Sequence, residues 1–226
     1  MNPASFVNQL KSVHLASVFN PYADTCAVYD KEDAASIRCK NLRDYFKAAI
    51  AYDIDTIWMG RDLGHLGGRR TGMALTDEHH LPDVHLVYAG FKPVRATHGI
   101  AIKERTATEI WSLLREVHKP PLLWNVFQFH PYEPGNPFTN RKFSTQELKA
   151  TTELNATLIS WLRIKRIVAI GGDAARYSQQ FGVKVVAIRH PSYGGISAFR
   201  QGICEEYQLQ EGRTALSFNQ PGLFSG

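Results

Sequence analysis

The chain has 226 residues, of which 44% are hydrophobic and 21% charged; this composition is globular and excludes the disordered and fibrous classes. The formal net charge of +5 favours an anionic partner such as nucleic acid, because Lys and Arg release counterions from phosphate backbones. No apolar run approaches the length of a membrane span and the N-terminus shows no secretory signal, so we expect a cytoplasmic protein with no membrane contact.

The three cysteines, Cys26, Cys39 and Cys204, are odd in number and widely spaced. This pattern argues against a disulfide framework and against a cysteine-ligated zinc or iron–sulfur site. His79, His80 and His85 resemble a metal cluster only superficially, because they lack a helical i, i+4 pair. We therefore expect no metal and no other cofactor. We also expect the chain to be a monomer.

The first half of the chain predicts one long helix and one buried strand. Leu42, Phe46 and Ile50 recur at every fourth position, which is typical of the buried stripe of a helix that runs to about Ala51. The short apolar run 56–59 ends at Gly60 and predicts a buried strand. A glycine-rich, polar segment follows, to about residue 76, and its apolar residues fit neither the period of a helix nor that of a strand.

The middle of the chain predicts two helices, one strand and a long loop. A capping-box pattern at 106–109 predicts the start of a helix, and residues 122–127 read as the next strand. The loop 130–143 is rich in Pro, Gly and Asn, and long ordered loops are often functional. A second capping box, at 144–147, precedes a helix whose apolar face carries Leu154, Leu158 and Leu162.

Two further strands are expected at 167–170 and 183–188. The first ends in Gly171-Gly172 before a short helix, and the second leads through residues 189–195 into a terminal helix. Strands that alternate with helices predict an α/β fold with a largely parallel sheet covered on both faces. We expect a single domain over residues 1–226, a three-layer αβα sandwich around a short, mainly parallel sheet.

Each predicted strand ends in a chemically distinctive residue or pair. Asp62 follows the first strand, Asn125 lies in the second, Gly171-Gly172 follows the third and His190 follows the fourth. Ligands of open α/β sheets bind beyond the carboxyl ends of the strands. The coincidence predicts a ligand site at this edge of the sheet.

Each of these side chains also has a purely structural interpretation. Asp62 can serve as an acceptor or general base, or simply cap its turn. Asn125, in an otherwise apolar strand, can be satisfied by the backbone or can pair with both polar edges of a nucleobase. His190 can donate a hydrogen bond to a developing negative charge, or lie exposed in its loop.

The order of these motifs resembles the uracil-DNA glycosylase superfamily. The two signature motifs are matched by Gly60-x-Asp62-x-x-His65 and His190-Pro191-Ser192, with Asn125 between them. Shorter segments are similar to the small bacterial branches of the superfamily without an iron–sulfur cluster, and the resemblance runs from about Asn20 to about Tyr207. It includes the segments 68–72, 76–78, 104–108, 125–131, 134–137, 140–141 and 190–195.

The resemblance implies a monofunctional glycosylase that flips a nucleotide out of DNA and hydrolyses its N-glycosidic bond. Asp62 would activate water and stabilise the sugar cation, and His190 would stabilise charge on the base oxygen. The base would be bound by Gly60, Gly64, Leu75 and Asn125. DNA contacts would come from Arg69 and Arg70 and from the loop with Ser192, Tyr193, Gly194 and Ile196, in which either Tyr193 or Ile196 would enter the base stack.

Three positions depart from the superfamily pattern. Leu63 stands where the best-known branches carry Pro, and Leu75 stands where an aromatic residue would stack on the base. Gly64 replaces a Tyr that blocks the 5-position of the base in the uracil-restricted branch. Leu63 alters the turn, whereas the open 5-edge at Gly64 and the missing aromatic at Leu75 together suggest a roomier pocket and, as a hypothesis, a 5-modified pyrimidine of foreign DNA as the substrate.

Two other function classes remain as alternatives. A catalytically weak DNA-binding relative would have no need to keep Asp62, Asn125 and His190 together. A generic α/β hydrolase or nucleotide enzyme would need a nucleophile elbow or a P-loop, and residues 67–72 lack the Gly-Lys-Ser/Thr ending of the latter. We rank the glycosylase first.

Overall fold

The structure is a computed structural model that describes residues 1–209. Its centre is a four-stranded parallel sheet in the order β3-β2-β5-β6. The strands are β2 (Thr56–Gly60), β3 (Leu122–Asn125), β5 (Arg166–Ile170) and β6 (Lys184–Ile188). Strands β2 and β3 are buried on both faces, as parallel strands between helical layers are expected to be.

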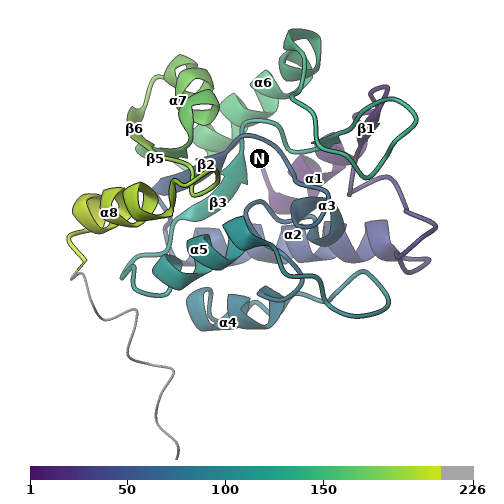
Figure 1. The fold of residues 1–226 in the computed structure, drawn as a ribbon, viewed down its shortest axis with the longest axis horizontal. Helices are drawn as coiled ribbons and strands as arrows, with labels where there is room; N and C mark the ends of the chain where they lie inside the picture. Colours follow the sequence, from purple (N-terminus) through teal and green to yellow (C-terminus); the bar gives the residue numbers. More distant parts are fainter. Residues whose placement is uncertain (210–226) are drawn as a thin grey trace, which may run out of the picture.

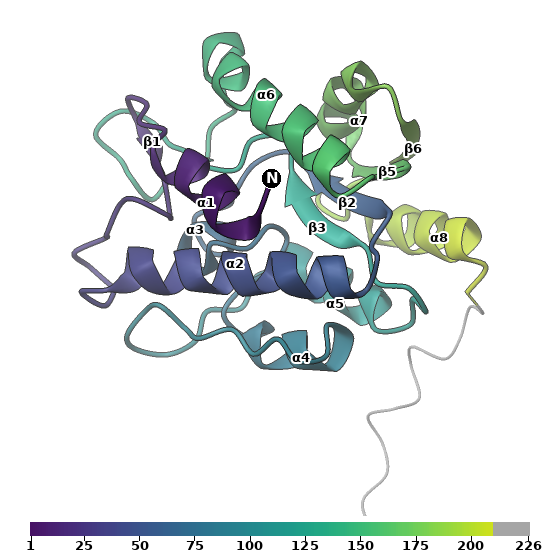
Figure 2. The same cartoon turned by 180° about the vertical axis from the view of Figure 1, so that it is seen from behind.

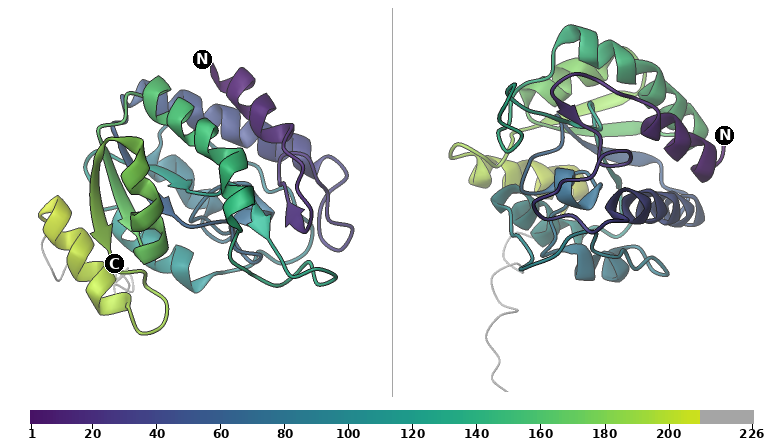
Figure 3. Two further views of the ribbon diagram at one scale, coloured as in Figure 1. Left: turned by 90° about the horizontal axis from the view of Figure 1, so that it is seen from above. Right: turned by 90° about the vertical axis from the view of Figure 1, so that its right-hand side faces the viewer.

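The sheet is covered by helices on both faces, which confirms the predicted three-layer αβα arrangement (Figures 1 and 2). One layer contains α6 (Thr145–Trp161) and α7 (Gly172–Ser178), with the 3₁₀ turn η2 (Gln179–Phe181) after α7. The other layer contains α5 (Arg105–Leu114) and α8 (Ile196–Tyr207), which contact each other. Seen from above, the strands stand between α7 and α8 (Figure 3).

The remaining elements pack around the β3 side of the sheet. They are α1 (Pro3–Lys11), β1 (Val18–Phe19), α2 (Ala34–Ala51), α3 (Gly68–Thr71), η1 (Leu81–Asp83), α4 (Val84–Val87) and β4 (His130–Pro131). Strands β1 and β4 form a separate antiparallel pair. Phe46 of α2 packs against Phe6 of α1, Trp124 of β3 and Trp161 of α6, and this aromatic cluster joins the N-terminal helices to the sheet.

Side chains, rather than another strand, complete the outer edge of β3. The Tyr88 hydroxyl donates to the carbonyl of Pro121 at 2.6 Å, and the Tyr45 hydroxyl accepts from the N–H of Leu123 at 2.7 Å. Gln128 Nε2 donates to the carbonyl of Asn125 at 2.6 Å. An unpaired backbone group in this buried position would be costly, so these contacts stabilise the strand that ends in Asn125.

The predicted elements differ from the structure in three details. Ile50 is 48% exposed and lies off the buried stripe of α2. The capping box at 106–109 does not form, because α5 already begins at Arg105, with Glu104 as its N-cap residue. Strand β3 ends at Asn125, so Val126 and Phe127 are buried beyond the strand.

The capping box at 144–147 is confirmed. Ser144 and Glu147 satisfy each other's backbone N–H groups at the start of α6. Leu158 is fully buried on this helix, with Leu154 and Leu162 partly buried beside the core. Within residues 1–209, no helix combines the length and the apolar character needed to cross a membrane.

Candidate active site

A cavity of about 520 Å³ opens at the carboxyl ends of β2, β5 and β6. Its walls come from the turn after β2, the loop before α5, the loop before α6, and the segments that follow β5 and β6. Of the predicted site residues, the cavity is lined by Gly60, Asp62, Gly64, Leu75, His190, Ser192 and Tyr193. The predicted convergence of the strand ends therefore produces one hollow of a size that accepts a small ring-shaped ligand.

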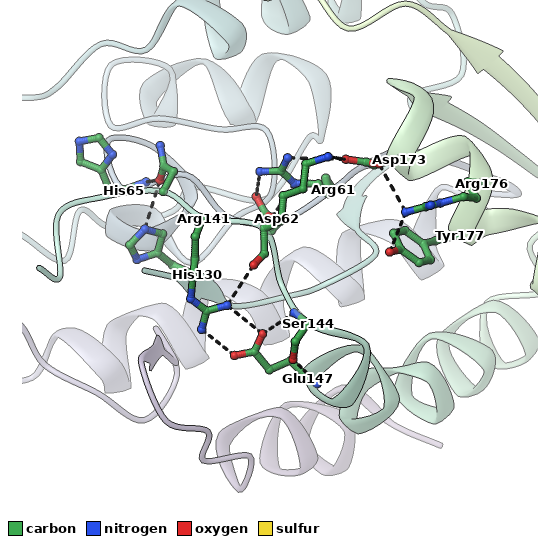
Figure 4. A network of polar contacts seen from close by, with 12 residues as sticks. Arg61, Asp62, His65, His130, Arg141, Ser144, Glu147, Asp173, Arg176 and Tyr177 are labelled. Carbon is green, nitrogen blue, oxygen red and sulfur yellow. Dashed lines mark hydrogen bonds and ion pairs between the residues drawn. The ribbon is translucent and has the colours of Figure 1, made fainter. Parts of the chain in front are cut away.

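Asp62 is held in this cavity by its neighbour in the chain. Arg61 Nε lies 2.7 Å from Asp62 Oδ2, and the second terminal nitrogen of Arg61 lies 3.3 Å from Oδ1. Arg61 also approaches Asp173 of α7 at 3.7 Å, so that the guanidinium lies between two carboxylates (Figure 4). The Asp62 carboxylate is oriented by an ion pair and does not cap its own turn.

Two opposing effects act on the ionisation of Asp62. Burial raises the pKa of its carboxyl above the ordinary value, and the negative charge of Asp173 adds to the rise. Arg61 partly offsets both by a hydrogen bond and by its positive charge. A buried carboxylate whose pKa is raised is a stronger base than a solvated one, which suits a group that takes a proton from water.

His190 has one defined tautomer. The backbone N–H of Ser192 donates to His190 Nδ1 at 3.1 Å, so Nδ1 has no proton and the neutral ring carries it on Nε2. Burial, followed by the positive charges of Arg189 and Arg61, lowers the pKa of His190 to about 4. At neutral pH the side chain is therefore an uncharged hydrogen-bond donor at the cavity wall.

The close approach of Gly171 to this ring requires glycine. Gly171 has a φ of +98°, and a Cβ at this position would lie 3.2 Å from His190 Cβ. Gly171 thus leaves room for the imidazole that follows β6, whereas a Cβ on Gly172 would meet no atom within 4 Å.

Asn125 lies behind the cavity and does not line it. Its amide is buried, and neither Oδ1 nor Nδ2 has a hydrogen-bond partner among the described residues. A Cβ on Gly60 would lie 2.4 Å from Asn125 Oδ1 and 2.9 Å from Leu75 Cδ2. Leaving a buried amide unpaired costs about 1–3 kcal/mol per group, so this amide is the strongest indication of a missing polar ligand.

Leu75 and Gly64 border the cavity as expected. Leu75 is half-buried, with a φ of +55° that is unusual for a residue with a branched side chain. Beyond Gly64 the space ends at a carboxyl: a Cβ on Gly64 would lie 3.8 Å from Glu104 Oε1, and one on Gly67 would lie 2.4 Å from Glu104 Oε2.

The loop after His190 presents one aromatic side chain to solvent. Tyr193 is 98% exposed, has a φ of +53° and stands at the rim of the cavity. Ile196 is half-buried as the first residue of α8, and Gly194 is exposed with a φ of +74°. Ser192 faces the cavity, and its backbone fixes the His190 ring.

Arg69 and Arg70 do not lie on a DNA-accessible surface. The Arg69 side chain is enclosed, with its guanidinium 3.9 Å from the Phe19 ring and hydrogen bonds to Tyr29 and to the carbonyl of Pro137. Arg70 stacks 3.8 Å from the Tyr29 ring and pairs with Glu78 at 3.0 Å. Their exposures of 2% and 8% argue against the predicted DNA contacts, because both guanidinium groups already have partners inside the protein.

Several cavity residues were not predicted from the sequence. They are Arg61, Glu104, Arg141, Lys142, Asp173 and Arg189. Arg61 and Arg189 are immediate neighbours of Asp62 and His190, so their places in the motifs were a usable signal. The others come from helix starts and from the loop 130–143; Glu104 and Arg141 lie in segments that the resemblance includes and Asp173 follows Gly171-Gly172, but none of these patterns indicated a place in the site.

The rim of the cavity is predominantly basic. Lys142 Nζ lies 3.0 Å from Asp173, and Arg141 forms a bidentate pair with Glu147 at 2.6 and 2.9 Å. Figure 4 shows Arg141 between Glu147 and Asp62. Arg189 is exposed and donates to the carbonyls of His190 and Tyr193. These charges surround the opening through which a polyanion would approach.

No protein-family model matches this chain, and no curated protein matches it in sequence. Among solved structures, the chain is similar to wild-type SMUG2 from Pedobacter heparinus, with a TM-score of 0.61 and 13% sequence identity. The alignment covers 92% of this chain and 96% of the other. At this identity the likeness shows a shared fold along nearly the whole length of both chains.

Proposed function

We propose that this chain is a DNA glycosylase that removes a uracil or a modified pyrimidine from DNA and leaves an abasic site. The observation that carries the proposal is the buried, unpaired amide of Asn125 behind a cavity that Asp62 and His190 line. The shared fold supports it, because SMUG2 is a glycosylase of the uracil-DNA glycosylase superfamily. The sequence motifs point to the same superfamily.

In this proposal the target nucleotide leaves the duplex and its base enters the cavity. The unpaired amide of Asn125 offers one donor and one acceptor, which match the Watson–Crick edge of a pyrimidine. Leu75 lies close to this amide, so its side chain has to rotate aside when the base binds. The exposed Tyr193 ring is the better candidate to fill the emptied stack, since Ile196 is partly buried in α8.

Hydrolysis then follows from the two titratable groups. The Asp62 carboxylate orients a water molecule and stabilises positive charge on the sugar as the N-glycosidic bond breaks. His190 Nε2–H donates to the base oxygen that receives the bonding electrons. The water oxygen bonds to the sugar carbon, one water proton passes to Asp62, and the base leaves as an anion that is protonated afterwards.

The proposal is tested with labelled single- and double-stranded DNA that carries uracil, a thymine mismatch or a 5-modified pyrimidine. We expect strand cleavage only after alkali treatment. Asp62→Asn is expected to lose turnover, whereas Asp44→Asn, on the surface of α2 and outside the cavity lining, should keep it. Asn125→Asp should change which base is accepted.

Two outcomes would redirect the proposal. Cleavage without alkali would indicate a lyase step and make Lys142, which lines the cavity, the first lysine to substitute. DNA binding without cleavage of any base would favour the catalytically weak DNA-binding relative.

A further inference from the structure

Asp173 forms ion pairs with three cations at the rim of the cavity. It is the second residue of α7, and it lines the cavity. Its Oδ2 lies 3.0 Å from Lys142 Nζ and 3.7 Å from a terminal nitrogen of Arg61. Its Oδ1 lies 3.6 Å from a terminal nitrogen of Arg176, and Figure 4 shows Asp173 between the two arginines. One carboxylate thus contacts cations from the loop before α6, from the turn after β2 and from α7.

These ion pairs are accessible to solvent. The Asp173 side chain is 28% exposed, and those of Lys142 and Arg176 are 72% and 68% exposed. The Lys142 ammonium beside it holds the pKa of the Asp173 carboxyl below its ordinary value, so the carboxylate is charged at neutral pH. Ion pairs between exposed groups are weak in water. Another anion can therefore replace Asp173 at these cations.

The two exposed cations are positioned without Asp173. Arg176 donates to the Tyr177 hydroxyl at 2.8 Å, and its guanidinium carbon lies 4.5 Å from the centre of the Tyr177 ring. The same ring packs against Phe143, the residue after Lys142, with 5.2 Å between the ring centres. This contact joins the loop before α6 to α7. A purely structural role for the carboxylate is therefore not required.

The proposed function brings phosphates to this rim. When a flipped base enters the cavity, the phosphates on either side of its sugar remain outside, at the opening. Lys142 and Arg176 attract these phosphates, whereas the charge of Asp173 repels them. A phosphate and Asp173 thus compete for the same two cations.

We propose that Lys142 and Arg176 form a binding site for a backbone phosphate of DNA, and that Asp173 occupies this site as an internal competitor until DNA displaces it. Arg61 is not part of the site, because it remains paired with Asp62 at 2.7 Å. The inference rests on the proposed function for the identity of the anion. It goes beyond that function by assigning a phosphate site and a contact that limits the affinity for DNA.

The competitor acts on all DNA sequences alike, because phosphate contacts carry no direct sequence information. It lowers the affinity for DNA that holds no target base. The expected consequence is a shorter residence at each undamaged position while the protein searches along the duplex.

The test measures affinity for DNA without a target base, so that turnover does not enter. Fluorescence anisotropy is recorded at several salt concentrations. Asp173→Asn should bind roughly 3- to 10-fold more tightly than wild type, with a slope of log affinity against log salt that is steeper by about 1. Asp44→Asn is the matched control, because Asp44 is 30% exposed, pairs with Lys40 and Lys47 on α2 and lies outside the cavity lining. It removes the same charge and should change the affinity much less.

Two further measurements locate the phosphate. Arg176→Gln should weaken binding and reduce the salt slope by about 1. In a protein that carries both Lys142→Gln and Arg176→Gln, the further change Asp173→Asn should no longer strengthen binding. Replacing single phosphates by neutral methylphosphonates along the strand should reduce the gain from Asp173→Asn at one position.

The outcomes separate this inference from the proposed function. Unchanged or weaker binding by folded Asp173→Asn, or an equal gain from Asp44→Asn, would overturn the competitor. Should Asp173→Asn fail to fold, Arg176→Gln decides, because an Arg176 that only supports α7 would leave the affinity unchanged. Tighter binding by Asp173→Asn, with no base cleaved by wild type, would leave the phosphate site standing and remove the glycosylase.

Discussion

Asp62 and Glu104 are two carboxyl groups in one cavity, and the charges next to them differ in sign. Asp62 is paired with Arg61, whereas Glu104 lies near Asp77, a second carboxylate. When the surroundings of two titratable groups in one site push their pKa values apart, the two groups commonly have different chemical roles. In our proposed function Asp62 is the carboxyl that acts on water.

The pairing of Asp62 predicts both a mutational effect and a pH profile. Asp62→Asn should lower the single-turnover rate by roughly 100-fold or more, the usual loss for a general base, and affect DNA binding much less. Its raised pKa, with that of His190 at about 4, predicts that the rate falls as the pH decreases, because Asp62 gains a proton and His190 then becomes charged. Rates between pH 4 and 8 measure this, and a rate that rises toward acid would contradict the assignment.

Glu104 predicts a pH-dependent change in stability. Its pKa is raised to about 7 in the folded state from 4.5, so the folded state holds the proton more tightly and stability falls as the pH rises from 4.5 through 7. Asp77, itself paired with His80, is the charged group that faces it, with Thr106 beside it. Glu104→Gln removes the titration and should stabilise the protein more at pH 8 than at pH 5, by about 2 °C or more in Tm. An equal shift at both pH values in thermal unfolding would be the contrary result.

Residues that follow strands were predictable, and residues that approach through space were not. Asp62 and His190 line the cavity because the ends of parallel strands meet at one edge, and this follows from the order of elements alone. Glu104 comes from the start of α5, so its approach to Gly64 depends on how the helix docks. Arg69 is enclosed by Phe19, a residue 50 positions away, and its charge in the sequence therefore gave no sign of burial.

At the scale of elements, α6 holds the segment that follows β3. Asn155 is fully buried on this helix, and its Oδ1 accepts from Trp124 Nε1 at 2.9 Å and from Gln128 Nε2 at 2.6 Å. Its Nδ2 donates to the carbonyl of Val126 at 2.7 Å. One amide thus connects a helix to both sides of Asn125 in the chain.

Asn155→Leu should therefore destabilise the fold strongly. It leaves the indole N–H, one amide and one carbonyl without this partner in the core, and we expect a loss of about 2–4 kcal/mol in the free energy of unfolding. Urea denaturation measures the loss, and Ser160→Ala, exposed on the same helix, is the matched control. A change as small as that of the control would show that the network does not hold β3.

The two capping-box patterns in the sequence show why the existence of a helix was easier to predict than its first residue. At 144–147 the pattern coincides with a loop that ends in Ser144, and the reciprocal bonds form. At 106–109 the same pattern lies one residue inside a helix that starts earlier, because Glu104 is held by Asp77. Tertiary contacts decided the second case.

The whole molecule places its basic side chains unevenly around the cavity. Lys142 and Arg189 are exposed at the rim, whereas Arg38, Arg69 and Arg70 are buried with internal partners. The net charge of +5 therefore overstates the positive charge that a phosphate backbone would meet, and under our proposed function the rim residues give the better count of phosphate contacts.

This distribution predicts the salt dependence of DNA binding. The Lys142 side chain is 72% exposed, and its single ion pair with Asp173 is worth little in water. Lys142→Gln should weaken binding similarly for all sequences and reduce the slope of log affinity against log salt by about 1. Lys184→Gln, exposed at the opposite ends of the strands, should leave the slope unchanged in a fluorescence-anisotropy titration. Equal slopes for wild type and Lys142→Gln would remove Lys142 from the interface.

The phenol groups of Tyr45 and Tyr88 bond to the outer edge of β3, and this affects whether a second copy of the chain can add a strand there. An uncovered outer strand is a template on which another polypeptide can extend the sheet, which is the first step of many aggregates. Here the groups that would recruit such a strand, at Pro121, Leu123 and Asn125, are already bonded to two hydroxyls and an amide. These three bonds leave the strand next to the candidate base pocket with fewer free backbone groups to which a second copy could add a strand.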